Sequence, residues 1–186
     1  LTSRVIDRPM RPLFPKDYRN DVTINNMVMS VDPSCRPELT AMIGSALVTS
    51  ISDIPFAGPC STTQMGLIDG EFIVNPSQEQ WKNSDLNLTV ASTMEKVIMI
   101  EAGANEVPED KMIEAIYMCH EINQKINAWI NQIVAEVGKQ KHEYASCAIP
   151  AELFDAMKSI VTPEEMEDAV FTDEKQVREE NIRKIT

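Results

Sequence analysis

The residues best suited to chemistry are the arginines near the start of the chain. Arg4, Arg8 and Arg11 follow one another at intervals of four and three residues. If this stretch is helical, Arg4 and Arg8 lie one turn apart on one face. A guanidinium group offers a planar fork of N–H donors that matches phosphate oxygens. One interpretation is therefore contact with phosphate or a nucleic-acid backbone. The other is a purely structural ion pair between Asp7 and Arg11 or Arg4.

The sequence contains no other familiar arrangement for catalysis. It has no phosphate-binding loop of the Gly-Lys-Ser/Thr type, no Gly-x-Ser-x-Gly motif and no Cys-x-x-Cys pair. His120 and His142 are far apart, and neither is placed like a zinc ligand or a general base. The acidic residues of 164–168 follow a Thr-Pro helix start, where the helix dipole favours negative charge. We therefore predict no catalytic residue and no metal ligand in this chain.

Composition narrows the class of protein. The 186 residues carry a formal net charge of −12, which argues against a general nucleic-acid coat. The only basic stretch is the N-terminal one, where Lys16 and Arg19 join the three arginines. No apolar run approaches the roughly 18 residues of a membrane span, and no signal-peptide pattern is present. The four scattered cysteines are expected to be reduced thiols of a cytoplasmic protein, and the missing initiator Met suggests a piece of a larger one.

Hydrophobic patterning predicts an α/β fold. Pro9 and Pro12 are expected to stop a short helix over Arg4–Arg8. The expected order continues as a strand, a buried helix, a hairpin turning at Asp69-Gly70, two more strands and a long helix stopped by Gly138. The corresponding ranges are Val22–Val31, Leu39–Ile51, Thr63–Asn75, Leu86–Val90, Val97–Ile100 and Pro108–Val137. On the long helix, the predicted apolar positions include Met112, Ile116, Cys119, Ile126, Ile130, Ile133 and Val137.

The last part of the chain changes character. Residues 141–150 are predicted to be a linker, and residues 151–186 a set of short helices. Thr162-Pro163-Glu164-Glu165 has the pattern of a capping box with proline at the first helical position. The predicted division is therefore a core domain over 1–140, a linker over 141–150 and an all-helical segment over 151–186.

Several segments resemble one family in the same order. The stretch Arg4-Val-Ile-Asp-Arg-Pro-Met-Arg-Pro-Leu-Phe-Pro15 resembles a signature of the bacterial polynucleotide phosphorylase (polyribonucleotide nucleotidyltransferase) family. The resemblance continues over roughly residues 1–140, and the tail is similar to the family's all-helical domain more loosely. The further matching segments are Met42–Ala46, Ser52–Pro59, Gly66–Pro76, Leu88–Ala91 and Val97–Glu101.

The resemblance implies a partial ribonuclease-PH-like core followed by the start of a helical domain. In that family two such cores flank the helical domain, three subunits form a ring, and single-stranded RNA threads a central channel. Its members are phosphate-dependent 3′-to-5′ exoribonucleases that release nucleoside diphosphates with the help of Mg²⁺. The serines that bind phosphate and the aspartates that bind metal belong to the second core, which is absent here. The chain alone is therefore expected to be inactive.

For this segment the resemblance implies a role as scaffold and RNA-path surface. Arg4, Arg8 and Arg11 are the predicted contacts to RNA or phosphate, although the family's first core is regarded as a degenerate phosphate site. The expected partners are single-stranded RNA, two further subunits in a homotrimer and proteins of an RNA-degradation complex, with inorganic phosphate as co-substrate and no membrane. The alternative is a non-catalytic module that only helps to assemble a ring.

Overall fold

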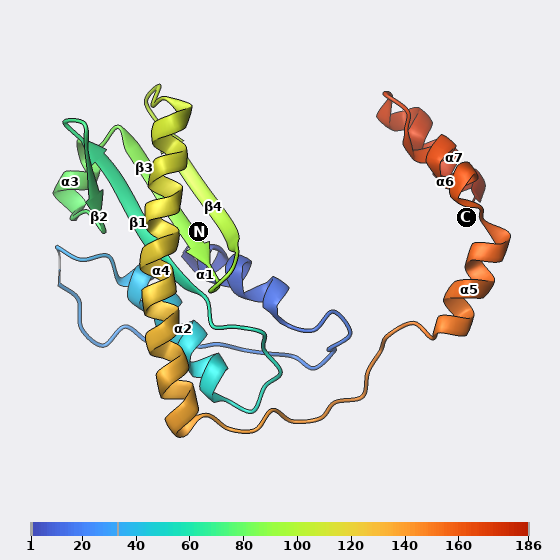
Figure 1. Cartoon of the computed structure of the whole chain (residues 1–186), viewed down its shortest axis with the longest axis horizontal. Coiled ribbons are helices and arrows are strands. Elements are labelled where there is room, and N and C mark those ends of the chain that lie inside the picture. The colour runs from blue at the N-terminus through green and yellow to red at the C-terminus, as the bar shows by residue number, and fades with distance from the viewer. Residues whose placement is uncertain (1, 33, 186) are drawn as a thin grey trace. The chain divides into compact units, whose positions relative to one another are not determined.

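A four-stranded antiparallel sheet organises the first part of the chain (Figure 1). The computed structural model describes residues 2–32 and 34–185. Their contacts divide the chain into two units, Leu1–Ala145 and Ser146–Thr186. The strand order is β2-β1-β3-β4, and the strands are β1 (Ser61–Ile68), β2 (Glu71–Val74), β3 (Leu86–Ser92) and β4 (Val97–Ala104). The predicted α/β class is confirmed. The assignment of the ranges to named domains stays a prediction.

The predicted hairpin is confirmed at the predicted turn. Asp69 and Gly70 join β1 to β2 with φ angles of 52° and 83°. Two successive positive φ angles are typical of the tight turn whose twist matches antiparallel strands. Because this signal is local, the dipeptide was enough to locate the turn from the sequence.

Helices cover both faces of the sheet. On one face α4 (Glu109–Val137) packs Ala115 and Cys119 against Met65, Leu88 and neighbouring strand residues. The opposite face is covered by α1 (Thr2–Met10) and α2 (Pro37–Ile51), whose buried residues meet β3 and β4. The predicted helix over Leu39–Ile51 is thus confirmed, with Pro37 at its first position. None of the helices in the described ranges is both long and apolar enough to cross a membrane.

The strand predicted over Val22–Val31 is wrong. This segment is irregular and lacks any strand partner within the described residues, and Met27 and Met29 are 81% and 85% exposed. A strand is stabilised by its ladder partners rather than by local preference. Without such a partner the segment runs beside α2, where the Asn26 amide donates to Ser45 Oγ at 2.9 Å.

The expected stop at Pro9 is also wrong. Helix α1 continues to Met10, and the 3₁₀ turn η1 (Arg11–Leu13) follows at once. A proline in the last turn costs one backbone hydrogen bond, and here its ring is fully buried, which offsets part of that cost. Pro12 lies in the first positions of η1, where its missing N–H is not needed.

Helix α4 ends at Val137 with Gly138 as its cap, as predicted, but its buried stripe differs from the apolar positions read from the sequence. Two asparagines, Asn123 and Asn127, are fully buried in it. The Asn123 side chain accepts from Thr63 Oγ1 at 2.8 Å and donates to Val90 O and Ser92 Oγ, both at 3.0 Å. A polar network thus ties α4 to β1 and β3.

Residues 138–150 form neither helix nor strand, and their first part is held against the end of α2. Lys139 N donates to Ile51 O at 2.9 Å and His142 N to Asp53 O at 2.8 Å. The Lys141 ammonium group donates to Ser50 O at 2.9 Å and Ser52 O at 2.7 Å. Burial lowers the pKa of Lys141, and the nearby Asp53 carboxylate opposes this effect. A cation here donates to the free carbonyls at the C-terminal end of α2 and interacts favourably with the dipole of that helix.

Replacing Lys141 by methionine is expected to lower the free energy of unfolding of the first unit by about 1 kcal/mol, because carbonyls at the end of α2 lose their charged donor. Both tryptophans lie in this unit, so urea denaturation followed by tryptophan fluorescence measures it. Lys139→Met is the matched control, since that side chain is exposed and only its backbone N–H bonds to α2. Equal stability of the two variants would contradict the capping role.

The second unit contains α5 (Ala151–Ile160), α6 (Pro163–Val170) and α7 (Lys175–Ile185). The predicted capping box is confirmed at the start of α6. Glu165 N donates to Thr162 Oγ1 at 3.2 Å, and Thr162 N donates to Glu165 Oε2 at 3.0 Å. The same device begins α3 (Gln78–Lys82), a short helix that we did not predict although Ser77 and Gln80 have the capping-box spacing.

Candidate functional site

The three predicted arginines lie on α1 and η1, and all three side chains are exposed. Helical spacing is the reason that Arg4 and Arg8 share one side of α1. Arg4 makes no hydrogen bond or ion pair to the rest of the chain that the structure describes. Its guanidinium group is therefore available to an external anion.

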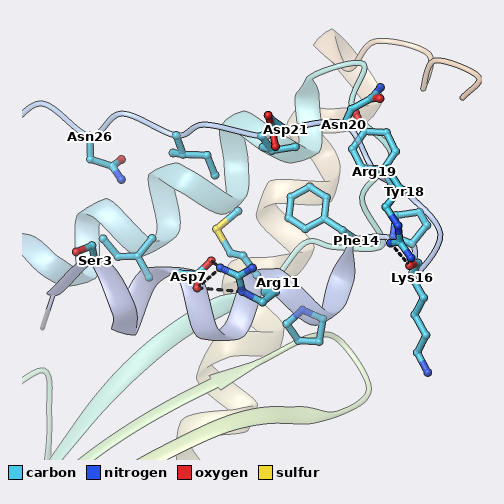
Figure 2. Close-up of a pocket in the computed structure, with 16 residues that line it drawn as sticks. Ser3, Asp7, Arg11, Phe14, Lys16, Tyr18, Arg19, Asn20, Asp21 and Asn26 are labelled. Carbon is cyan, nitrogen blue, oxygen red and sulfur yellow. Dashed lines mark hydrogen bonds and ion pairs between the residues drawn. The ribbon is translucent and has the colours of Figure 1, made fainter. Parts of the chain in front are cut away.

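Arg11, in η1, is bound to Asp7 of α1 (Figure 2). Its Nη2 lies 2.8 Å from Asp7 Oδ1 and 2.7 Å from Oδ2, and its Nε donates to Oδ2 at 3.1 Å. Of the two pairings that the sequence left open for Asp7, the structure shows the one with Arg11. The fork-to-carboxylate geometry uses the donors that a phosphate would need. With Nε and Nη2 engaged by Asp7, Arg11 has fewer free donors for a second anion than Arg4.

Arg8 faces a different acid. Its Nη1 lies 3.9 Å from Glu101 Oε2 on β4, beyond hydrogen-bond distance, and the two side chains are 56% and 44% exposed. An exposed ion pair of this length contributes little and is easily exchanged. The structure thus separates the three arginines: Arg8 pairs loosely with the sheet, Arg11 pairs tightly with Asp7, and Arg4 extends into solvent.

A cavity of about 680 Å³ lies between α1, η1 and residues 15–26 (Figure 2). Of the predicted arginines, only Arg11 lines it. Lys16 and Arg19 line it as well, and Arg19 Nη1 donates to Lys16 O at 2.7 Å. Both belong to the basic N-terminal stretch, but neither is among the predicted contacts. The charge count of the first twenty residues was the signal for them.

Aromatic side chains join Tyr18, which lines this cavity, to the segment after α4. Tyr18 packs edge-on against Tyr144 with ring centroids 5.0 Å apart, and its hydroxyl lies 3.3 Å from His142 Nε2. The Tyr144 hydroxyl donates to Asp17 Oδ1 at 2.9 Å. This bond raises the pKa of Tyr144, with smaller contributions from burial and from the Asp17 charge. The loop that contains Lys16 and Arg19 is therefore fixed to the segment that follows α4.

The cysteines give no reactive centre in the first unit's core. Burial raises the pKa of both Cys60 and Cys119 to about 12. Because the thiolate is the nucleophile, these thiols are poorly reactive near neutral pH. Within the described ranges, no group of three or more His, Cys, Asp or Glu side chains is placed to hold a metal ion.

Iodoacetamide at pH 8 is expected to alkylate Cys35 and Cys147 in the native chain, since both are exposed. Cys60 and Cys119 should react only after unfolding or as the pH approaches their raised pKa values. Mass spectrometry of peptides after timed labelling distinguishes the four sites. Rapid native labelling of Cys60 would show that this part of the core opens readily.

A sequence model and two similar proteins relate this chain to known proteins. The sequence model described as "3' exoribonuclease family, domain 2" matches residues 58–122. A polyribonucleotide nucleotidyltransferase of Lachnoclostridium phytofermentans is 72% identical over 185 residues, covering 100% of this chain and 26% of that protein. The protein of the same name from Ruminiclostridium cellulolyticum is 51% identical over 186 residues, with the same two coverages. The chain belongs to the polyribonucleotide nucleotidyltransferase family.

The chain spans about a quarter of the length of these relatives, 26% in each case. The crystal structure of rice (Oryza sativa) Rrp46 has a TM-score of 0.49 and 12% sequence identity, covering 56% of this chain and 49% of that one. The identity to the two relatives over the whole chain confirms the family resemblance predicted from the sequence.

The residues matched by the family model run from just before β1 into α4. Arg4, Arg8 and Arg11 lie outside that range, but they fall within the region aligned to the two relatives. Their contact with RNA or phosphate is therefore a matter for proposal and experiment.

Proposed function

We propose that the longer protein containing this segment is a phosphate-dependent 3′-to-5′ exoribonuclease. A phosphate oxygen attacks the terminal phosphodiester, the P–O3′ bond breaks, and a nucleoside diphosphate and an RNA one nucleotide shorter leave. The observation that carries the proposal is the 72% identity, over the whole chain, to a protein named polyribonucleotide nucleotidyltransferase. The proposed substrate is single-stranded RNA, the co-substrate is inorganic phosphate, and the metal is Mg²⁺ bound outside this chain.

Within that enzyme we propose that this segment is scaffold and RNA-path surface. Arg4 and Arg8 support the second role because their guanidinium groups are exposed and form no close hydrogen bond to described residues. We further propose a homotrimer in the cytoplasm that associates with RNA-degradation proteins. Exposed apolar residues on α4, such as Tyr117 (66%) and Trp129 (51%), suit burial between subunits.

The test compares the full-length protein and this chain on polyadenylate with Mg²⁺, with and without phosphate, while nucleoside diphosphate release is measured. Phosphate-dependent release by the full-length protein alone is the expected result. Release that does not depend on phosphate would overturn the proposed reaction. Release by the chain itself would overturn the placement of catalysis elsewhere.

The alternative is a ring-assembly module that does not act on RNA. It would be favoured if a correctly assembled full-length protein released nothing and bound no RNA even at low salt. Binding that weakens steeply as salt is added would instead support an RNA-path surface.

A further inference from the structure

A second cavity, of about 300 Å³, lies on the sheet face opposite α4. Its floor includes Gln64, Thr89 and Glu101, which form one row across β1, β3 and β4. Its walls include Arg36 and Glu38 at the start of α2 and Trp81 of α3. The cavity therefore occupies the part of this face beyond the N-terminal end of α2.

Four buried oxygen atoms around this cavity have no hydrogen-bond partner among the described residues: Glu38 Oε2, Gln64 Oε1, Asn87 Oδ1 and Glu101 Oε2. All four are acceptors as oriented. Gln64 is only 7% exposed, and its amide nitrogen donates to Thr89 Oγ1 at 3.4 Å, which leaves its oxygen unpaired. Leaving buried acceptors without donors is costly, so their concentration in one cavity points to an occupant.

The arginines beside the two carboxylates do not satisfy them. Arg36 Nε lies 3.9 Å from Glu38 Oε2, and its guanidinium carbon lies 4.8 Å from the centre of the Trp81 ring. Arg8 Nη1 is also 3.9 Å from Glu101 Oε2. Both distances exceed those of hydrogen bonds. Both carboxylates thus keep accepting capacity toward the cavity.

Gly103 leaves one side of the cavity open. Asn87 pairs across the sheet with Gly66 on β1 and Gly103 on β4, so no side chain flanks it in its own row. A Cβ added to Gly103 would meet no atom within 4 Å. The Asn87 amide therefore has no neighbour in its row with which to pair, and the space above Gly103 is free for a ligand.

We propose that this cavity binds an organic cation rich in N–H donors, carrying a guanidinium or ammonium group. Arg36 and Arg8 balance the charges of Glu38 and Glu101, so the ligand is inferred from the four unpaired oxygen atoms, which require N–H donors. A guanidinium has five N–H donors and an ammonium three, which matches a set of carboxylate and amide oxygens. Only two carboxylates line the cavity, which suits an organic cation better than a divalent metal.

The test is calorimetric titration of the chain with agmatine, which carries both a guanidinium and an ammonium group. Saturable binding is expected, and tetramethylammonium, which has the charge but no N–H donor, should not compete. Glu38→Gln and Glu101→Gln should each weaken binding about tenfold, the usual loss for one charge-assisted hydrogen bond. Glu95→Gln, at an exposed acid in the β3–β4 turn, is the matched control and should change nothing.

A second variant tests the open space of the cavity independently of its charged side chains. Gly103→Leu places a side chain into the open space, leaves every charge in place, and should abolish binding. Its spectrum of native amide resonances shows whether the fold is kept. Absence of saturable agmatine binding, equal effects of the Glu95 and Glu101 variants, or displacement by tetramethylammonium would overturn the proposal.

The titration is repeated on the full-length protein to distinguish two sources of the cation. Binding in both proteins assigns the site to a free small molecule. Binding by this chain but not by the full-length protein assigns the same donors to an arginine or lysine side chain supplied by the rest of the polypeptide.

Discussion

Replacing Asn123 by leucine is expected to lower the free energy of unfolding of the first unit by about 3–5 kcal/mol. Asn123 is fully buried, and its side chain makes hydrogen bonds to Thr63 Oγ1, Val90 O and Ser92 Oγ. Leucine has a similar size but no polar atom, so these partners would stay buried without a side chain to bond. Each orphaned group costs about 1–3 kcal/mol, which exceeds the gain from burying a more apolar side chain.

Urea denaturation followed by tryptophan fluorescence measures this loss. Asn131→Leu is the matched control, because Asn131 is exposed on the same helix and forms no side-chain hydrogen bond to described residues. The control should change the free energy of unfolding by less than about 0.5 kcal/mol. A loss in Asn123→Leu no larger than in the control would mean that the network contributes nothing net to stability.

Asn123 also shows the limit of reading α4 from its sequence. Hydrophobic spacing correctly gave a helix of the right length, because period and caps are local signals. It could not place Asn123 in the core, because an asparagine reads as a solvent-facing residue unless its partners are known. Those partners are on β1 and β3, about 30 to 60 positions earlier in the chain.

The difference between local signals and partners that are distant in the chain also separates the correct predictions from the incorrect ones elsewhere. Asp69-Gly70 and Thr162-Pro163 each determine a turn or a helix start by themselves, and both predictions are confirmed. The segment 22–31 has the composition of a strand, but strand formation requires a partner that local composition does not reveal.

At the candidate site, the sequence predicted the elements better than the contacts. The spacing of Arg4 and Arg8 was enough to place them on one side of a helix. It could not show that Asp7 would bind Arg11 rather than Arg4, which depends on the continuation of the chain through Pro9. Nor could it show Glu101, which is brought beside Arg8 by the sheet. Whether each arginine is free to bind an anion therefore depends on its tertiary contacts.

In the full-length protein, the double substitution Arg4→Ala and Arg8→Ala is expected to weaken binding of single-stranded oligoadenylate about 30- to 100-fold at low salt. This is the loss of two charge-assisted contacts to phosphate. The slope of log affinity against log salt concentration should fall by about 1.4, since each phosphate contact on a single strand contributes about 0.7. Fluorescence anisotropy at several salt concentrations measures both quantities.

Arg11→Ala is the matched control, because it removes an arginine of the same segment whose donors are already held by Asp7. It should change the affinity less than about twofold, while Asp7→Asn, which weakens the hold on Arg11, should strengthen binding. If Arg11→Ala costs as much affinity as the double substitution, Arg11 leaves Asp7 to meet the RNA, and the division of roles seen in the structure is wrong. If neither variant alters affinity or salt dependence, the N-terminal arginines are structural and the RNA path lies elsewhere.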